Sequence, residues 1–214
     1  MQYFAALGYA VLQINYRGSI GYGQDFIQRD IFEVCDKSVA DVADGLKWAV
    51  EQGYADPKRL VVCGNSFGGY IAVALAARYP DLPACVAAFA GVYDWNYQHR
   101  YASNERPELF AWISNYYPEA KDNAERYRAV SPVHQAAAIN APVLLIHGRQ
   151  DKVVDIGQSE VMARALRKAG KPVEILKDAE GGHGLTDFSL RKKYYERLTS
   201  FFQQYAPSDP ATAP

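Results

Sequence analysis

Residues 60–70 read LVVCGNSFGGY, and this stretch decides the fold. Its first four residues are apolar and rich in β-formers, which is typical of a buried strand. The segment from Phe67 to Tyr79 is rich in alanine and predicts a helix that Pro80 ends. Between strand and helix, residues 64–68 fit the pattern Gly-x-Ser-x-Gly. A serine in such a strand–turn–helix connection has the setting of a nucleophile, and we predict this role for Ser66.

The sharpness of this turn predicts several features of the site. Ser66 should adopt strained backbone angles, and Gly64 and Gly68 should be required because a side chain there would clash with neighbouring backbone. The strain directs the Ser66 hydroxyl out over the sheet. The following helix points its N-terminus at the same place, so the Phe67 N–H is the candidate oxyanion donor. The structural alternative is a glycine-rich turn that happens to contain a serine.

Strand and helix patterns alternate along the rest of the chain. Short apolar runs predict further strands at 8–15, 84–90, 142–147 and 172–176. Helical periodicity predicts helices at 39–50, 159–169 and 189–205. Strands that are apolar on both faces and alternate with helices form a mostly parallel sheet covered on both sides. The predicted class is therefore α/β, with the α/β-hydrolase fold.

Two segments depart from this rhythm. Residues 93–132 are aromatic and polar, and we expect them to be an irregular insertion above the sheet. Residues 206–214 are rich in proline, alanine and serine, so we expect a disordered tail. The domain prediction is thus one hydrolase domain at 1–205 followed by a tail at 206–214.

Composition excludes several classes of function. The chain has 214 residues, enough for one domain, of which 49% are hydrophobic and 22% charged. Its formal net charge of -1 argues against nucleic acid as a partner, and no apolar run is long enough to span a membrane. Without a signal-peptide layout, the default compartment is the cytoplasm. Cys35, Cys63 and Cys85 lie in no metal-binding pattern, so we expect no metal and three buried, reduced thiols.

A serine nucleophile needs a base to take its proton, and the chain has four histidines. In this fold the order along the chain is serine, acid, histidine. Asp151 follows the apolar strand ending at His147, and catalytic groups gather at the carboxyl ends of parallel strands. His183 lies among glycines after the next strand, in a loop able to fold onto the sheet. We predict that His183 shuttles the proton and that Asp151 orients the imidazole and stabilises its charged form.

Other residues compete for these roles. Asp155 is the main alternative acid, and Asp178 is a weaker one. His147 has a position suitable for the base, but it ends a buried strand, which favours a structural hydrogen bond. His99 and His134 lie in expected loops and should be solvated.

These motifs together make the chain resemble the prolyl oligopeptidase family, in particular its dipeptidyl-peptidase and acylaminoacyl-peptidase branches. The matching stretches follow the family's order and spacing over nearly the whole chain: Asn15 to Ser19 with Gly21-Tyr22-Gly23, Gly64 to Tyr70, His147 through Asp151 to Val154, and Gly182-His183-Gly184. The resemblance implies hydrolysis of a peptide or acyl-amino bond through an acyl-enzyme. It implies a peptide or acyl-peptide substrate and no cofactor.

The resemblance also implies a specificity pocket, built from the residue after the serine and from aromatic residues after the next strand. The corresponding positions are Phe67, Val92 and Trp95, with Val154 near the acid. An apolar cluster beside the nucleophile suits a small hydrophobic side chain or a proline ring. The alternative is that Tyr93 and Trp95 only pack beneath the irregular segment.

The chain departs from the family in two respects. Dipeptidyl peptidases often carry an asparagine two residues after the acid, where this chain has Val153, and this argues against a dipeptidyl peptidase. The family's domain also begins upstream of strand 8–15, with further strands and a loop that supplies a second oxyanion donor. One of those strands lies between strands 8–15 and 60–63. We therefore expect a chain that lacks its first strands and is marginally stable or oligomeric, with reduced activity, unless strand 8–15 moves sideways to pair with 60–63.

Three functions stay open from the sequence. The main prediction is a serine peptidase. A carboxylic-ester hydrolase of the same fold is the second, because the triad does not identify the leaving group. The third is a catalytically impaired fragment or binding module that keeps the three residues.

Overall fold

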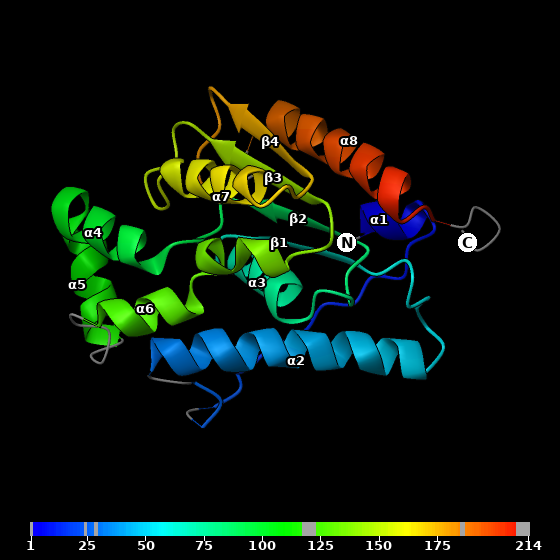
Figure 1. Cartoon of the computed structure of the whole chain (residues 1–214), viewed down its shortest axis with the longest axis horizontal. Coiled ribbons are helices and arrows are strands. Elements are labelled where there is room, and N and C mark those ends of the chain that lie inside the picture. Colours follow the sequence, from blue (N-terminus) through cyan, green and yellow to red (C-terminus); the bar gives the residue numbers. More distant parts are fainter. Residues whose placement is uncertain (1, 24, 28–29, 117–122, 185–186, 209–214) are drawn as a thin grey trace.

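The computed structural model describes residues 2–23, 25–27, 30–116, 123–184 and 187–208, and in this part of the chain four strands form one sheet (Figure 1). All neighbouring strands are parallel, and their order is β1-β2-β3-β4. The strands are β1 (Val61–Asn65), β2 (Cys85–Phe89), β3 (Val143–Gly148) and β4 (Val173–Asp178). The helices are α1 (Gln2–Ala6), α2 (Ile31–Glu51), α3 (Phe67–Arg78), α4 (Trp95–Glu105), α5 (Pro107–Tyr116), α6 (Ala124–Val130), the 3-10 helix η2 (Pro132–Ala138), α7 (Gly157–Lys168) and α8 (Phe188–Tyr205).

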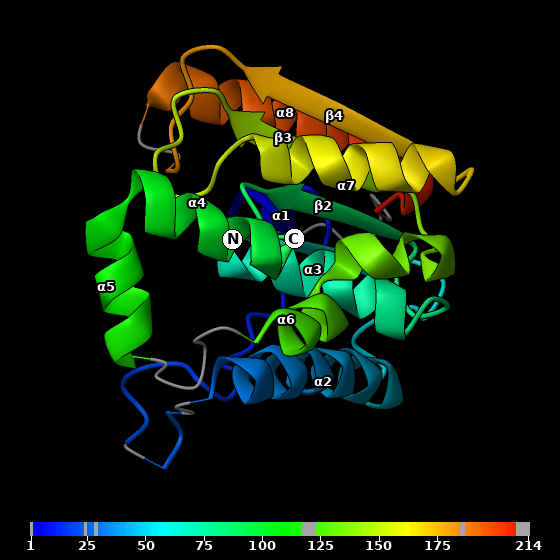
Figure 2. The ribbon, with the colours of Figure 1, turned by 60° about the vertical axis from the view of Figure 1, so that its left-hand side comes forward.

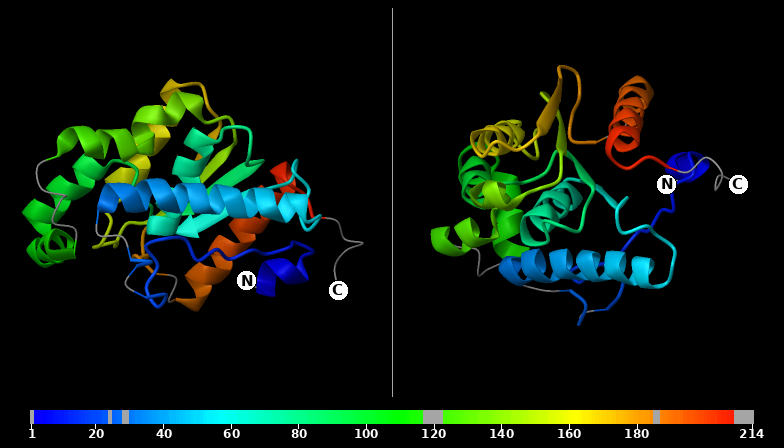
Figure 3. Two further views of the ribbon diagram at one scale, coloured as in Figure 1. Left: turned by 90° about the horizontal axis from the view of Figure 1, so that it is seen from below. Right: turned by 45° about the vertical axis from the view of Figure 1, so that its right-hand side comes forward.

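Helices cover both faces of the sheet, as its apolar strands predict. β2 and β3 are buried over their whole length. Because successive side chains of a strand point to opposite faces, Val143 and Leu145 join the core with α2, α3 and α7, whereas Leu144 and Ile146 pack against α8. The same division is visible in Figure 3, where α8 and α1 lie on one side of the sheet and α2, α3 and α7 on the other. The α/β-hydrolase prediction is confirmed.

The strand expected at 8–15 is not formed. Residues 9–15 lie in no strand and are mostly exposed, with Val11 40% and Leu12 45% accessible. The segment passes beside α2 (Figure 3), where Ile14 contacts the helix so closely that a Cβ on Gly45 would overlap it. A strand forms when its backbone N–H and C=O groups pair with those of a neighbouring strand, and this segment runs alongside helix α2 instead. The alternative expectation, direct pairing with β1, is therefore also wrong.

β1 is an edge strand of the described sheet, and its cysteine, Cys63, is accessible to solvent. β1 pairs with β2, and no other described strand pairs with it. Cys63 in β1 is exposed, whereas Cys35 and Cys85 are buried. The prediction of three buried thiols is wrong for Cys63, which lies in the edge strand of the described sheet.

The segment 93–132, expected to be irregular, contains α4, α5 and α6. These helices lie together beyond the carboxyl ends of the strands (Figures 1 and 2). Side chains cap two of them: Asp94 accepts from the Tyr97 N–H at 3.0 Å, and Asn123 accepts from the Arg126 N–H at 3.3 Å. The helices are short, and α4 buries only Gln98 and Ala102, so the hydrophobic periodicity that predicts helices is weak here.

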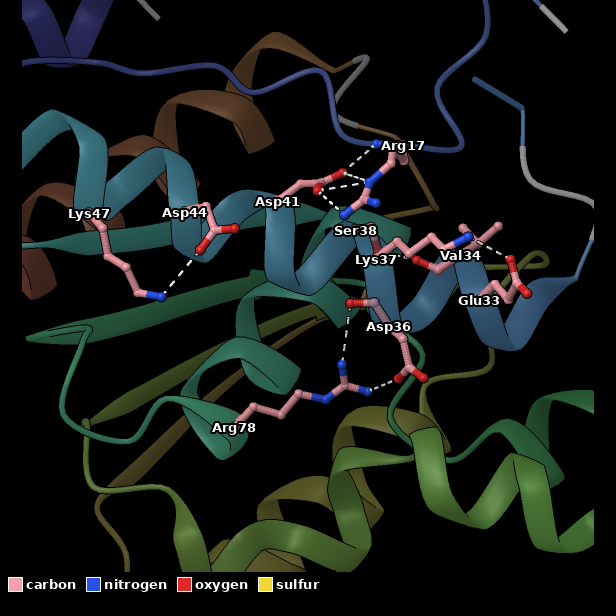
Figure 4. A network of polar contacts seen from close by, with 10 residues as sticks. All are labelled: Arg17, Glu33, Val34, Asp36, Lys37, Ser38, Asp41, Asp44, Lys47 and Arg78. Atoms are coloured by element: carbon pink, nitrogen blue, oxygen red, sulfur yellow. Dashed lines mark hydrogen bonds and ion pairs between the residues drawn. The ribbon is translucent and has the colours of Figure 1, made fainter. Parts of the chain in front are cut away.

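Ion pairs attach α2 to the segments beside it (Figure 4). Asp41 accepts from the backbone N–H of Arg17 at 2.8 Å and from its guanidinium at 2.5 Å, and Asp36 pairs with Arg78 of α3. Burial raises the pKa of Asp41, but the hydrogen bonds from Arg17 outweigh it and hold that pKa below its ordinary value. The Asp41 contacts fix the loop around Arg17, which forms part of the wall described below. α2 itself starts at Ile31, earlier than predicted, because Asp30 caps it through the Phe32 N–H.

The C-terminal helix α8 is followed by ordered chain. Ala206, where the expected tail begins, is buried, and the Tyr9 hydroxyl donates to its carbonyl at 3.1 Å. Residues 209–214 of that expected tail lie outside the described residues. Within the described ranges, no helix has the length and apolar character needed to cross a membrane.

Candidate active site

Ser66 occupies the turn between β1 and α3, in the strained conformation that the sequence predicts. Its backbone angles are φ 57° and ψ -119°, in a region that residues with a side chain rarely adopt. The Ser66 N–H donates to the Phe89 carbonyl at 2.8 Å, which holds the turn against β2. The first helical bond of α3 runs from the Tyr70 N–H to the Ser66 carbonyl at 3.0 Å. The N–H of Phe67 is thus free of helical bonding at the N-terminus of α3.

The glycines of the turn differ in whether a Cβ atom would fit at their positions. A Cβ on Gly64 would overlap the carbonyl of Gly68, so Gly64 is required by close backbone contact, as predicted. A Cβ on Gly68 would meet nothing within 4 Å, so the same prediction is wrong for Gly68. The second tight position is Gly69, where a Cβ would lie 2.9 Å from the Phe89 carbonyl oxygen. The close approach is therefore made by the backbone of α3 to the two strands behind it.

The three residues predicted as a triad meet at the carboxyl ends of the strands. His183 Nε2 lies 2.9 Å from Ser66 Oγ, and His183 Nδ1 lies 2.8 Å from Asp151 Oδ2. Because Asp151 has no proton to donate when ionised, Nδ1 carries the hydrogen and Nε2 faces the Ser66 hydroxyl as an acceptor. The His183 side chain is 24% exposed and that of Asp151 is 0% exposed. This order of hydroxyl, imidazole and buried carboxylate allows a proton to pass from Ser66 to His183.

Donors surround the Asp151 carboxylate. Its Oδ1 accepts from the N–H groups of Val153 at 2.8 Å and Val154 at 2.9 Å. Its Oδ2 accepts from His183 and also lies 3.2 Å from His147 Nε2. Burial alone would raise the pKa of Asp151, but the hydrogen bonds from the two histidines and the backbone outweigh it and hold the pKa well below its ordinary value. Asp151 is therefore ionised beside His183.

The alternative acids have other partners. Asp155 Oδ1 accepts from the Tyr97 hydroxyl and from the Gly157 N–H. Asp178 accepts from Lys193 Nζ at 2.6 Å. Lys193 is the main reason that the pKa of Asp178 lies below its ordinary value. Neither carboxylate has a hydrogen bond with His183 in the described structure, so the geometry favours Asp151.

The other three histidines differ in burial and in their contacts. His134 is exposed, as expected, although it lies in η2. His99 is not a solvated loop residue: it lies on α4, half-buried, with its ring 5.3 Å from that of Phe110. His147 is fully buried and makes the structural hydrogen bond that was predicted, to Ser159 at 2.8 Å. The sequence did not indicate that His147 also reaches Asp151.

An apolar cavity of about 340 Å³ opens beside Ser66. All four residues predicted for the specificity pocket line it: Phe67, Val92, Trp95 and Val154. The remaining wall comes from the loop before α2, from α2, α4, α5 and α6, and from the loop between β3 and α7, with Tyr16, Gly18, Ser19, Ile31, Val34, Gln98, His99, Ala102, Leu109, Phe110, Ile113, Tyr127 and Val153. These further residues were missed because they adjoin Ser66 only in the folded chain.

Aromatic rings form the part of the wall nearest the serine. The Phe67 ring stacks on Tyr70 with centroids 5.3 Å apart, and Trp95 meets both rings edge-on. Trp95 therefore both packs on the core and faces the cavity. Tyr93 is fully buried and does not line the cavity, so the packing alternative holds for Tyr93 only. Among the described residues, no cluster of His, Cys, Asp and Glu side chains is placed to hold a metal ion.

Known proteins share both this sequence and this fold. Residues 1–209 match the Prolyl oligopeptidase family. The chain is 29% identical over 219 residues to the acylamino-acid-releasing enzyme of Arabidopsis thaliana, covering 96% of this chain and 27% of that protein. It is 29% identical to dipeptidyl aminopeptidase BIII of Pseudoxanthomonas mexicana, covering 95% of this chain and 30% of that protein.

Solved structures of similar proteins share the fold of this chain. The uncomplexed acylaminoacyl peptidase of Pyrococcus horikoshii superposes with a TM-score of 0.80 at 27% identity, covering 91% of this chain and 32% of that one. A puromycin hydrolase superposes with a TM-score of 0.81 at 27% identity, covering 94% of this chain and 30% of that one. The chain spans about a third or less of the length of these relatives. With the family match extending over residues 1–209, the chain belongs to the prolyl oligopeptidase family.

Proposed function

We propose that this chain carries the catalytic residues of a serine peptidase that cleaves peptide or acyl-amino bonds through an acyl-enzyme. The observation that carries the proposal is the continuous contact from Ser66 Oγ through His183 to the ionised Asp151, beside an apolar cavity. Membership of the family supports it, as do relatives named for releasing acylamino acids and for aminopeptidase activity. No step of the proposed reaction requires a metal or cofactor.

In the first half of the reaction, Ser66 Oγ bonds to the carbonyl carbon of the substrate as its proton moves to His183 Nε2. The carbonyl oxygen becomes negative and lies near the N-terminus of α3, where the Phe67 N–H donates to it. Asp151 stabilises the imidazolium through Nδ1. The carbon–nitrogen bond then breaks, and His183 gives its proton to the departing amine, which leaves an ester on Ser66.

In the second half, water replaces the amine. Its oxygen bonds to the ester carbon while one of its protons moves to His183 Nε2. The bond between the acyl carbon and Ser66 Oγ breaks, and the proton returns to Ser66. The carboxylic acid is released, and the three residues are restored. Both halves use the same contacts, so one arrangement serves acylation and hydrolysis.

The cavity is the proposed site for an apolar side chain of the substrate. Its wall contains Ser66 itself and the aromatic rings of Phe67 and Trp95, so a group seated there is adjacent to the attacking oxygen. A volume of about 340 Å³ accommodates an apolar or aromatic side chain. The proposed substrate is therefore a peptide or acyl-peptide with a hydrophobic residue on the acyl side of the cleaved bond.

A comparison of leaving groups tests this proposal. The protein is assayed with an N-acylated aminoacyl p-nitroanilide and with a p-nitrophenyl ester that has the same acyl group. A peptidase hydrolyses both, and Ser66→Ala abolishes both activities. Hydrolysis of the ester alone would assign the chain to the ester hydrolases. Failure on both substrates by a folded protein would show that the described chain is catalytically impaired.

A further inference from the structure

We propose that His147 is a positioning residue that holds the Asp151 carboxylate in register with His183. The proposal rests on the proposed function, in which Asp151 supports the proton transfer. It extends the site from three side chains to four, because one carboxylate oxygen is shared between two imidazoles. His147 has no hydrogen bond to Ser66 and is not itself a residue of the cavity wall. It reaches the site through the Asp151 carboxylate and through the backbone carbonyl of Val154, which is a wall residue.

The contacts of the His147 ring support this role. Its Nε2 lies 3.0 Å from the Val154 carbonyl and 3.2 Å from Asp151 Oδ2, and its Nδ1 lies 2.8 Å from Ser159 Oγ. The side chains of His147 and Asp151 are both 0% exposed, so water does not compete for these contacts. His147 comes from the end of β3 and Ser159 from α7. These two elements lie on either side of residues 149–156, the acid loop, which carries Asp151.

The partners decide which nitrogen carries the hydrogen towards Asp151. A carbonyl and an ionised carboxylate can only accept, so Nε2 must be protonated, whatever the state of Nδ1. One N–H is thus shared between the Val154 carbonyl and Asp151 Oδ2. The same N–H ties the carboxylate to the backbone of its own loop, while Oδ1 is held by the Val153 and Val154 N–H groups.

This arrangement predicts a loss of positioning when the His147 N–H is removed. Asp151 Oδ2 then keeps His183 as its remaining side-chain partner, and the carboxylate is held less firmly against His183 Nδ1. Ionisable side chains near this cluster include Asp155, Tyr97 and Tyr101, and Tyr93 beside Ser159.

Two amides of different length provide a matched test. In His147→Gln the side-chain N–H extends to about the position of Nε2, whereas in His147→Asn it ends near the position of Nδ1 and cannot reach Asp151. We expect His147→Asn to lower kcat by about ten- to a hundredfold, as for the loss of a hydrogen bond to a charged group, with little change in KM. His147→Gln should recover most of the lost kcat.

Two outcomes would overturn the proposal: equal kcat in the two variants, or a His147→Asn enzyme that behaves as the wild type. If neither variant folds, nitrogen-detected NMR of the wild-type protein decides the question. A proton on His147 Nε2 supports the proposal, and a ring protonated only at Nδ1 refutes it. If the wild-type protein hydrolyses nothing, the proposed function fails separately, and the NMR measurement of the proton on His147 Nε2 still tests the hydrogen bond to Asp151.

Discussion

Ser66 Oγ and His183 Nε2 lie 2.9 Å apart although 117 positions separate them in the chain and their strands, β1 and β4, are the two edges of the described sheet. The loop after β4 must therefore cross the carboxyl ends of β3 and β2 to reach the serine. A hydrogen bond from the Gln150 N–H to the Gly181 carbonyl, 2.8 Å long, joins this loop to the loop after β3. Gly181 packs so closely on Gly148 that a Cβ on Gly148 would overlap it.

The two carboxylates of the acid loop should differ sharply in their effect on the rate. Asp151→Asn should lower kcat by about four orders of magnitude while preserving the fold, because an amide facing His183 Nδ1 favours the wrong tautomer. Asp155→Asn is the matched control, since Asp155 contacts Tyr97 and Gly157 and not His183. Its effect should be less than about tenfold. Steady-state kinetics on both variants measures this, and the reverse ranking would make Asp155 the acid.

The turn glycines offer a prediction about stability. Gly64→Ala should destabilise the protein by more than about 3 kcal/mol, because its Cβ overlaps the Gly68 carbonyl and the backbone must shift. Gly68→Ala should leave the free energy of unfolding unchanged or raise it by up to about 1 kcal/mol, since its Cβ meets nothing and alanine favours the helix. Urea denaturation of the two variants measures the difference. Equal losses of stability would contradict the described geometry of the turn.

Trp95 should determine which substrates are accepted. Trp95→Ala removes an aromatic ring from the cavity wall beside Ser66, and a bulky apolar acyl group loses more contact area with that ring than a small one does. The substitution should therefore reduce kcat/KM more for anilides with bulky apolar acyl groups than for those with small ones. The control is Trp48→Ala, which removes a tryptophan that is 49% exposed on α2 and does not line the cavity. Trp48→Ala should affect all substrates alike and only slightly. A uniform loss with Trp95→Ala would show that Trp95 serves folding alone.

The accessible edge of β1 predicts the reactivity of the thiols. Under native conditions a maleimide should modify Cys63 and spare the buried Cys35 and Cys85. All three should react after unfolding in urea, and Cys63→Ser should remove the native reaction. Mass spectrometry of the intact protein counts the modified thiols. A native protein in which Cys63 is protected would show that another segment or a second molecule covers this edge.

The sequence predicted that Ser66, Asp151 and His183 would lie together, and it could do so for a physical reason. A nucleophile turn needs glycine, serine and flanking strand and helix within a few residues, so the local pattern singles out Ser66 as the candidate. Asp151 and His183 follow buried strands, and parallel strands bring their carboxyl ends to one edge. These relationships depend on chain order and on strand direction, both of which can be read from the sequence.

The remaining features depend on tertiary contacts that local pattern does not contain. The apolar run at 8–15 has the composition of a strand, but composition cannot show whether a partner strand lies beside it. The helices of 95–130 are short, and part of their apolar residues line a cavity, so their pattern was harder to recognise than that of the longer helices. For the same reason most of the cavity wall, from Tyr16 to Tyr127, was not predicted. The contact of His147 with Asp151 likewise depends on how the acid loop folds back over β3.

Covalent labelling decides whether Ser66 is a nucleophile that His183 activates. A fluorophosphonate probe reacts only with a serine whose proton is accepted by a neighbouring base. We expect one probe per chain in the wild-type protein, located on Ser66 by peptide mass spectrometry. We expect no labelling of Ser66→Ala and greatly slowed labelling of His183→Ala. A folded wild-type protein that is not labelled, or equal labelling after Ser66→Ala, would show that Ser66 is not an activated nucleophile.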